Sequence, residues 1–135
     1  MLERVLIAVI LAAAGYAAWQ VFTRWQLSRA AQAGSGRDPL LSDAPSGIPT
    51  IVYFTTPTCA PCRLQQTPTL ERLKGELGDA LHVVRVDATE QPDAASRWGV
   101  VSVPTLFILG ADGAPRHVHN GVVSAAVLKQ QLVTA

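Results

Sequence analysis

The segment TIVYFTTPTCAPCRLQQ, residues 50–66, joins a run of β-branched and aromatic residues to a pair of cysteines. The run Thr50–Thr55 predicts a buried strand, because such side chains pack well on a pleated surface. Apolar residues then recur at helical spacing over Pro61–Leu77, which predicts a helix. Cys59 is therefore expected in the loop after a buried strand, and Cys62 in the first turn of the following helix.

The two cysteines are the only ones in the chain, and they form a redox couple, half of a metal site or a structural staple. Unpaired N–H groups and the positive dipole end at a helix N-terminus favour a thiolate over a thiol. Cys59 is therefore the predicted nucleophile. Cys62 lies one turn further on, where it can resolve the mixed disulfide that Cys59 forms with a substrate. Pro61 suits the start of the helix, because its missing N–H would have no intrahelical partner there.

The metal and staple alternatives have weaker support. Zinc takes about four ligands, and one CxxC motif supplies two. His117 and His119 share a strand face and would have to supply the others, but the chain has no second CxxC and no HxxxH spacing. A disulfide that closes so short a loop removes little entropy from the unfolded chain. The motif and its strand-to-helix setting favour redox chemistry, and no metal site is predicted.

Strand and helix signals alternate through the rest of the chain. Four leucines are predicted to share one face of the first helix, which ends at Gly78: Leu64, Leu70, Leu73 and Leu77. The further expected elements are strands at Leu81–Asp87, Thr105–Leu109 and Arg116–Asn120, a short helix at Gln91–Trp98, and a final helix capped by Ser124. This order predicts an α/β sandwich in which helices lie on the faces of one small sheet.

The N-terminal residues are apolar over a length that can cross a membrane. Val5–Phe22 is apolar apart from Gln20. A helix of about 18 residues is roughly 27 Å long, which is close to the thickness of the hydrocarbon core of a bilayer. Aromatic side chains that favour the headgroup level lie towards its C-terminal end: Tyr16, Trp19 and Trp25. Residues 1–25 are therefore predicted to form a single transmembrane anchor.

A cleavable signal peptide is the alternative to an anchor. Its apolar stretch would be Val5–Ala14, with Ala12 and Ala14 as the small residues before the cut. The apolar character continues to Phe22, which favours an uncleaved anchor.

The charges that flank the apolar segment leave the side of the membrane open. Arg24, Arg29 and Arg37 follow the segment, and Arg4 and the terminal amine precede it. The positive-inside bias leans towards a cytoplasmic body, by a margin of about one charge. Over the whole chain, eleven basic and ten acidic residues are scattered rather than clustered, so the sequence has no electrostatic footprint for nucleic acid.

Residues 26–48 are predicted to link the anchor to the folded domain. QLSRAAQA, residues 26–33, can continue the helix for two turns, and GSGRDPLLSDAPSGIP, residues 34–49, is rich in turn-forming residues. The chain length allows one small domain beside the anchor. That domain is predicted to occupy residues 49–135.

Four motifs occur in an order typical of one protein family. They are CAPCR at residues 59–63, VVRVDAT at 83–89, RWGVVSVPTLFIL at 97–109 and DGAPRHVHNGVVS at 112–124. On these motifs, residues 49–133 resemble a thioredoxin-family domain. The resemblance implies a thioredoxin-like sandwich with a central mixed sheet of about four strands flanked by helices.

The same resemblance implies roles for individual residues. Pro104 would be the family's cis-proline and would lie beside the Cys59 sulfur. Val103, Pro104 and Pro61 would contact the substrate, with the backbone before Pro104 free to pair with an extended chain. The implied reaction needs no cofactor other than the Cys59–Cys62 disulfide.

The chain departs from the family pattern at several places. Thr58 stands where the family has a tryptophan, and Tyr53 stands where it often has a buried aspartate, so removal of the Cys62 proton needs another base or water. Pro68 lies six residues after Cys62 rather than five, which predicts a local bulge in the helix. The family's first strand and helix have no clear counterpart between residues 24 and 47, so a sheet of four strands is expected.

The sequence therefore predicts a single-pass, membrane-tethered thiol-disulfide oxidoreductase of the protein-disulfide reductase type. Its expected partners are protein dithiols or disulfides, an unidentified electron donor, and the membrane through residues 5–22. Two alternatives stay open at this point. One is an exported thioredoxin-like protein that serves cytochrome or envelope-protein maturation, and the other is a redox-inactive docking module that uses the Pro104 surface.

Overall fold

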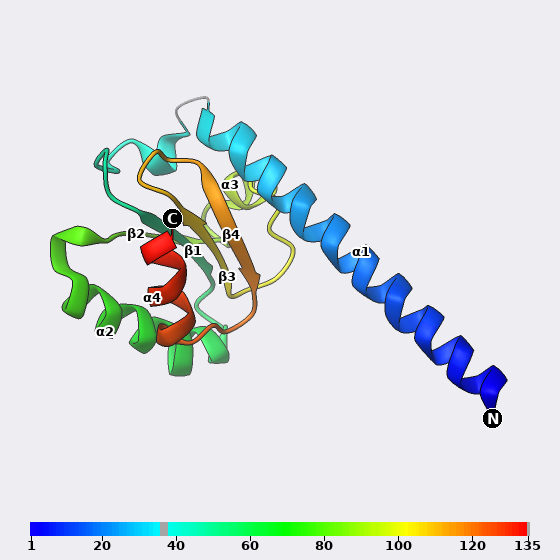
Figure 1. Cartoon of the computed structure of the whole chain (residues 1–135). Helices are drawn as coiled ribbons and strands as arrows, with labels where there is room; N and C mark the ends of the chain where they lie inside the picture. The colour runs from blue at the N-terminus through cyan, green and yellow to red at the C-terminus, as the bar shows by residue number, and fades with distance from the viewer. Residues whose placement is uncertain (36–37, 135) are drawn as a thin grey trace.

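The computed structural model describes residues 1–35 and 38–134 as a sheet-and-helix body from which one long helix projects (Figure 1). The sheet holds β1 (Thr50–Thr55), β2 (His82–Asp87), β3 (Thr105–Leu109) and β4 (Pro115–Asn120) in the order β2-β1-β3-β4. β1 runs parallel to β2 and antiparallel to β3, and β3 and β4 form an antiparallel hairpin. The mixed sheet of four strands predicted from the sequence is thus confirmed over the described residues.

Helices cover both faces of this sheet. α2 (Thr67–Leu77) and α4 (Ala125–Thr134) lie on one face, and α3 (Pro92–Arg97) lies on the other face with the C-terminal part of α1 (Leu2–Ser35). Short helical turns at Pro39–Leu41, Cys62–Gln66 and Gly78–Ala80 complete the elements. The predicted α/β sandwich is therefore the observed architecture.

The residues of β1 alternate between the two halves of the core. Ile51 and Tyr53 are buried in the cluster under α2 and α4, whereas Val52 and Phe54 are buried with Trp98 on the opposite face. Successive side chains of a strand project to opposite faces, so a central strand that is covered on both sides has to be apolar along its length. This explains why the segment that leads to the cysteines carries no charge.

The C-terminal turns of α1 belong to the body. Gln26 is fully buried, and its side-chain amide exchanges two hydrogen bonds with the amide of Asn120, with N···O distances of 2.9 and 2.7 Å. Gln26 Nε2 also lies 3.0 Å from Gly99 O, and Arg29 donates to a backbone carbonyl of α3. The expectation that no helix precedes β1 in the body is therefore wrong, although no further strand precedes it in the described residues.

Asp38 packs on the same face as this part of α1. Its carboxylate is buried and accepts hydrogen bonds from Trp98 Nε1, at 3.1 Å, and from the Arg97 guanidinium, at 3.2 Å to each oxygen. Burial raises the pKa of Asp38, but the hydrogen bonds from Arg97, the Leu40 N–H and Trp98, with the Arg97 charge, outweigh burial and hold that pKa below its usual value. Leu40 and Leu41 are partly buried against the same cluster.

These contacts bear on the division of the chain into an anchor at 1–25, a linker at 26–48 and a domain at 49–135. That division stays a prediction. The buried side chains of Gln26 and Asp38 nevertheless fall inside the predicted linker, so part of this range is packed on the sheet. Arg37, which enters the charge balance around the apolar segment, lies outside the described residues.

The N-terminal part of α1 is apolar and exposed. An 18-residue window of this helix has a mean hydropathy of 2.0, and none of the window is buried in the structure. The helix is thus long and apolar enough to cross a membrane, and an N-terminal signal sequence has the same properties. The structure thus confirms that the N-terminal residues form an apolar helix.

Candidate active site

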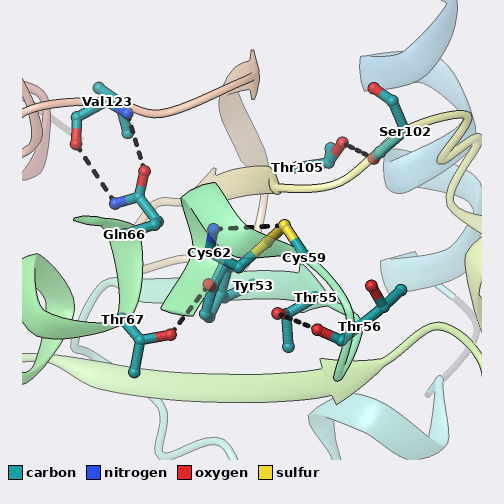
Figure 2. The surroundings of a disulfide bond; sticks show 10 residues. All are labelled: Tyr53, Thr55, Thr56, Cys59, Cys62, Gln66, Thr67, Ser102, Thr105 and Val123. Atoms are coloured by element: carbon teal, nitrogen blue, oxygen red, sulfur yellow. Dashed lines mark hydrogen bonds between the residues drawn. A yellow bond between two sulfur atoms is a disulfide. The ribbon is translucent and has the colours of Figure 1, made fainter. Parts of the chain in front are cut away.

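Cys59 and Cys62 are bonded to each other where β1 passes into the next helix (Figure 2). Their sulfur atoms are 2.09 Å apart and their Cα atoms 5.3 Å apart. Cys59 is 8 % exposed and Cys62 only 1 %, so an incoming sulfur reaches Cys59 first. The backbone N–H of Cys62 donates to Cys59 Sγ, with an N···S distance of 3.2 Å. A donor in this position stabilises the Cys59 thiolate once the disulfide is reduced.

The segment before β3 lies beside the two cysteines. The Val103–Pro104 peptide bond is cis, as the resemblance implies. Val103 packs against the buried cluster that contains both cysteines. Figure 2 shows Ser102 and Thr105, which flank these two residues, in the surroundings of the disulfide. Pro104 O accepts a hydrogen bond from the Gly121 N–H, at 2.9 Å, so the segment is held to the end of β4.

The residues predicted to contact substrates come from two segments. Pro61 is exposed between the cysteines, Val103 is half-buried and Pro104 is buried. Pro61 and Val103 thus offer side-chain surface to a partner, whereas Pro104 would act mainly through its shape and the adjacent backbone. The substrate contacts themselves stay a prediction.

A π-helical turn, Cys62–Gln66, begins at the second cysteine and leads directly into α2. The Thr67 N–H donates to Cys62 O, which closes a turn one residue longer than an α-helical turn. This is the bulge that the position of Pro68 predicts. The extra residue rotates the segment before α2, and the Leu64 side chain is 69 % exposed. The prediction that Leu64 shares the buried face of α2 is therefore wrong.

Gln66 belongs to the site, although no sequence motif marks it. It is fully buried, its Nε2 donates to Val123 O at 3.2 Å, and its Oε1 accepts from the Val123 N–H at 2.8 Å (Figure 2). Both backbone polar groups of Val123 are thereby paired. The two hydrogen bonds of Gln66 therefore hold the segment that follows β4 next to the cysteine pair.

Gln66→Leu is expected to lower the free energy of unfolding by about 1–3 kcal/mol, because the buried N–H and C=O of Val123 lose their partners. Gln65→Leu changes the exposed neighbouring residue and serves as the matched control, with an expected change within about 0.5 kcal/mol. Urea unfolding of the full chain in detergent micelles measures both variants. A Gln66 variant as stable as the wild type would contradict this role.

Tyr53 occupies the position where the resemblance implies a carboxylate. It is 1 % exposed, and its hydroxyl lies 3.0 Å from Thr67 Oγ1 (Figure 2). A pair of hydroxyl groups thus stands where the resemblance implies an acid. Thr58, at the family's tryptophan position, is exposed in the loop before Cys59.

The structure does not bring His117 and His119 to the cysteines. Both histidines lie on β4, where His119 Nε2 is 2.6 Å from Gln131 Oε1 of α4. Burial lowers the pKa of His117, and the nearby His119 lowers it further. Among residues 1–35 and 38–134, no three His, Cys, Asp or Glu side chains are grouped so that they could hold a metal ion.

Comparison with known proteins connects this geometry to a family. The family model described as Thioredoxin matches residues 41–134, more than two thirds of the chain. The chain belongs to the thioredoxin family. Thioredoxins exchange disulfides through such a cysteine pair, and the chain is accordingly a thiol-disulfide oxidoreductase.

Individual thioredoxins align with most of the domain. The chain is 34 % identical over 101 residues to the M-type chloroplastic thioredoxin of Chlamydomonas reinhardtii, and the alignment covers 73 % of this chain and 71 % of the relative. It is 40 % identical over 87 residues to thioredoxin 1 of Synechococcus elongatus, and that alignment covers 64 % of this chain and 79 % of the relative. It is 43 % identical over 56 residues to the thioredoxin of Bacillus subtilis, of which it spans about half, 53 %.

Solved structures agree with the family assignment. Chloroplastic thioredoxin z superposes with a TM-score of 0.64 at 26 % identity, covering 73 % of this chain and 88 % of that one. Thioredoxin-2, a component of a malaria parasite's protein secretion machinery, superposes with a TM-score of 0.61 at 22 % identity, covering 65 % and 84 %. At that identity the second likeness shows the fold alone.

Proposed function

We propose that the chain is a membrane-tethered protein-disulfide reductase whose thioredoxin domain acts through the CAPC pair. The observation that carries the proposal is the Cys59–Cys62 disulfide beside Val103, in a body that is packed onto the end of an exposed apolar helix. The reaction is inferred from the family, and the attachment to a membrane is inferred from α1.

The reduced cysteine pair would start the reaction. The Cys59 thiolate, favoured by the Cys62 N–H, attacks one sulfur of a substrate disulfide, and the other substrate sulfur leaves as a thiolate. The Cys62 thiolate then attacks Cys59 Sγ and releases the second substrate sulfur. Two electrons have passed to the substrate, and the enzyme holds the oxidised pair that the structure contains. A dithiol donor would reduce this pair for the next turnover.

Attachment to a membrane is supported by the surface of α1. Ile7, Ile10 and Leu11 are 52 %, 64 % and 66 % exposed, and no part of the body covers this stretch. Burial of one such side chain in an apolar environment is worth about 1.5–3 kcal/mol, so a bilayer is the environment that this surface fits.

Fractionation of cells that produce the full chain tests the attachment. The protein should remain with the membranes after washing with alkaline carbonate and should keep its full mass, while a matched chain without residues 2–22 should be soluble. A shortened protein in the soluble fraction would overturn the tether and support a cleaved signal peptide.

The same cells can report the side of the membrane. Acid trapping and alkylation give the redox state of the two cysteines, and an impermeant thiol reagent gives their accessibility. Reduced, protected thiols would indicate a cytoplasmic domain. Thiols that react from outside would place the domain beyond the membrane and favour a role in cytochrome or envelope-protein maturation.

A further inference from the structure

Helix α1 leaves the body at one end of β4. Gln26 is hydrogen bonded to Asn120, the last residue of β4, while Ala31 lines a surface cavity together with Pro115, the first residue of β4. Followed towards its N-terminus, α1 therefore passes along β4 from the Pro115 end to the Asn120 end. Its apolar part continues beyond the Asn120 end, as Figure 1 shows.

The disulfide lies at this same end of the sheet. Asn120 pairs with Thr105 of β3, and Thr105 pairs with Phe54 of β1. Thr105 directly follows Pro104, and Phe54 lies at the end of the strand that leads into the loop with Cys59. The exit of α1 and the active site are thus on one end of the sheet rather than on opposite ends.

The junction between α1 and the body has no flexible break. α1 is continuous from Leu2 to Ser35, and the amide pair of Gln26 and Asn120 fastens it to β4. The Trp25 ring packs on Gly99 so closely that a Cβ at that glycine would lie 3.1 Å from the ring. The apolar run ends at Phe22, only four residues before Gln26, which is about 6 Å along a helix. A bilayer that covers the apolar run would therefore reach the active-site end of the sheet.

Three of the segments next to the active site carry exposed apolar side chains. Leu64 is 69 % exposed, Val101 68 % and Val122 43 %. They come from the π-helical turn that begins at Cys62, the loop before Pro104 and the chain just after β4. Exposed apolar side chains on three segments next to a reactive site suit a partner whose own surface is apolar.

We propose that the substrate of the Cys59–Cys62 pair is a disulfide of an integral membrane protein, held at the surface of the bilayer. The inference rests on the proposed membrane-tethered reductase and adds the location and class of its substrate. The reduced pair gives two electrons to that disulfide, becomes oxidised, and is reduced again by a dithiol donor. A soluble disulfide far from the membrane is disfavoured because α1 directs the active-site end towards the lipid.

The test compares disulfides held at two heights above one bilayer. The full chain is reconstituted in vesicles of phosphatidylethanolamine and phosphatidylglycerol together with a single-span peptide that carries a disulfide-bonded loop next to its apolar segment. A second peptide carries the same loop on a helical spacer of about 20 residues, roughly 30 Å above the surface. The chain is reduced beforehand and freed of reductant, and alkylation counts the peptide thiols formed in a single turnover.

The native chain should reduce the loop at the surface at least about tenfold faster than the raised loop, because α1 restricts where its active site can reach. The matched variant carries a flexible Gly-Ser segment of about ten residues between Phe22 and Thr23, which keeps the anchor and the contacts of Gln26. In this variant the two rates should become similar. Both proteins should reduce soluble insulin, which shows that each contains a working cysteine pair.

Each other outcome counts against the inference. Equal rates of the native chain on the two peptides would overturn it, while reduction of insulin would leave the reductase function standing. A rate difference that persists in the insertion variant would also overturn it, because the difference would then come from the peptides and not from α1. A chain that reduces neither peptide nor insulin would overturn the proposed function together with the inference.

Discussion

Cys59→Ser is expected to lower the disulfide reductase turnover of the full chain by about 10³-fold or more, because a serine hydroxyl is not ionised at neutral pH and leaves no thiolate nucleophile. Cys62→Ser is expected to react once and then stop as a mixed disulfide, because no second thiolate attacks Cys59 Sγ. The two exposures support this difference, since Cys59 is 8 % exposed and Cys62 is 1 % exposed.

Two assays check the cysteine variants. Insulin reduction with dithiothreitol as the donor measures turnover, and acid trapping followed by non-reducing electrophoresis, in the absence of the donor, measures mixed disulfides. Ala60→Ser is the matched control, because it places a serine at the exposed position between the cysteines without removing a sulfur. Mixed disulfides in Cys59→Ser instead of Cys62→Ser would reverse the assigned roles. Wild-type turnover in Cys59→Ser would contradict the mechanism.

Trp98→Ala is expected to lower the free energy of unfolding by about 3–5 kcal/mol, the usual cost of emptying the site of a buried aromatic side chain. Trp98 is fully buried, and its ring centroid lies 5.2 Å from that of Phe107 and 6.2 Å from that of Phe54. The substitution also takes the indole N–H away from the Asp38 carboxylate, which is 3.1 Å from it. Urea unfolding in detergent micelles measures the loss as a lower midpoint.

Trp98→Phe separates the packing of this residue from its hydrogen bond. Phenylalanine keeps an aromatic ring against Phe54 and Phe107 but cannot donate to Asp38, so the expected loss is smaller, about 1–3 kcal/mol. The Arg97 guanidinium remains as a partner of the carboxylate. Equal losses in the two variants would show that the bond to Asp38, and not the packing of the indole, holds this part of the core.

Much of the fold and the centre of the site could be predicted from local patterns. TIVYFT and TLFIL form β1 and β3 at the predicted bounds, because strands with apolar residues on both faces belong in the middle of a covered sheet. The spacing of Cys59 and Cys62 at the start of a helix predicted the redox pair. The offset of Pro68 predicted the π-helical turn, yet the same turn moved Leu64 out of the face on which helical periodicity placed it.

The sequence by itself determined the order of strands and helices, the cysteine pair and the apolar N-terminal run, since each depends on residues that are close together in the chain. Only the tertiary structure decided which polar side chains are buried. Gln26 is bonded to Asn120, 94 residues away, and Gln66 to Val123, 57 residues away. Glutamine is usually exposed, and its burial becomes favourable only where such distant partners complete its hydrogen bonds. The contacts of Gln26 also set α1 against β4, which determines the end of the sheet from which the apolar helix projects.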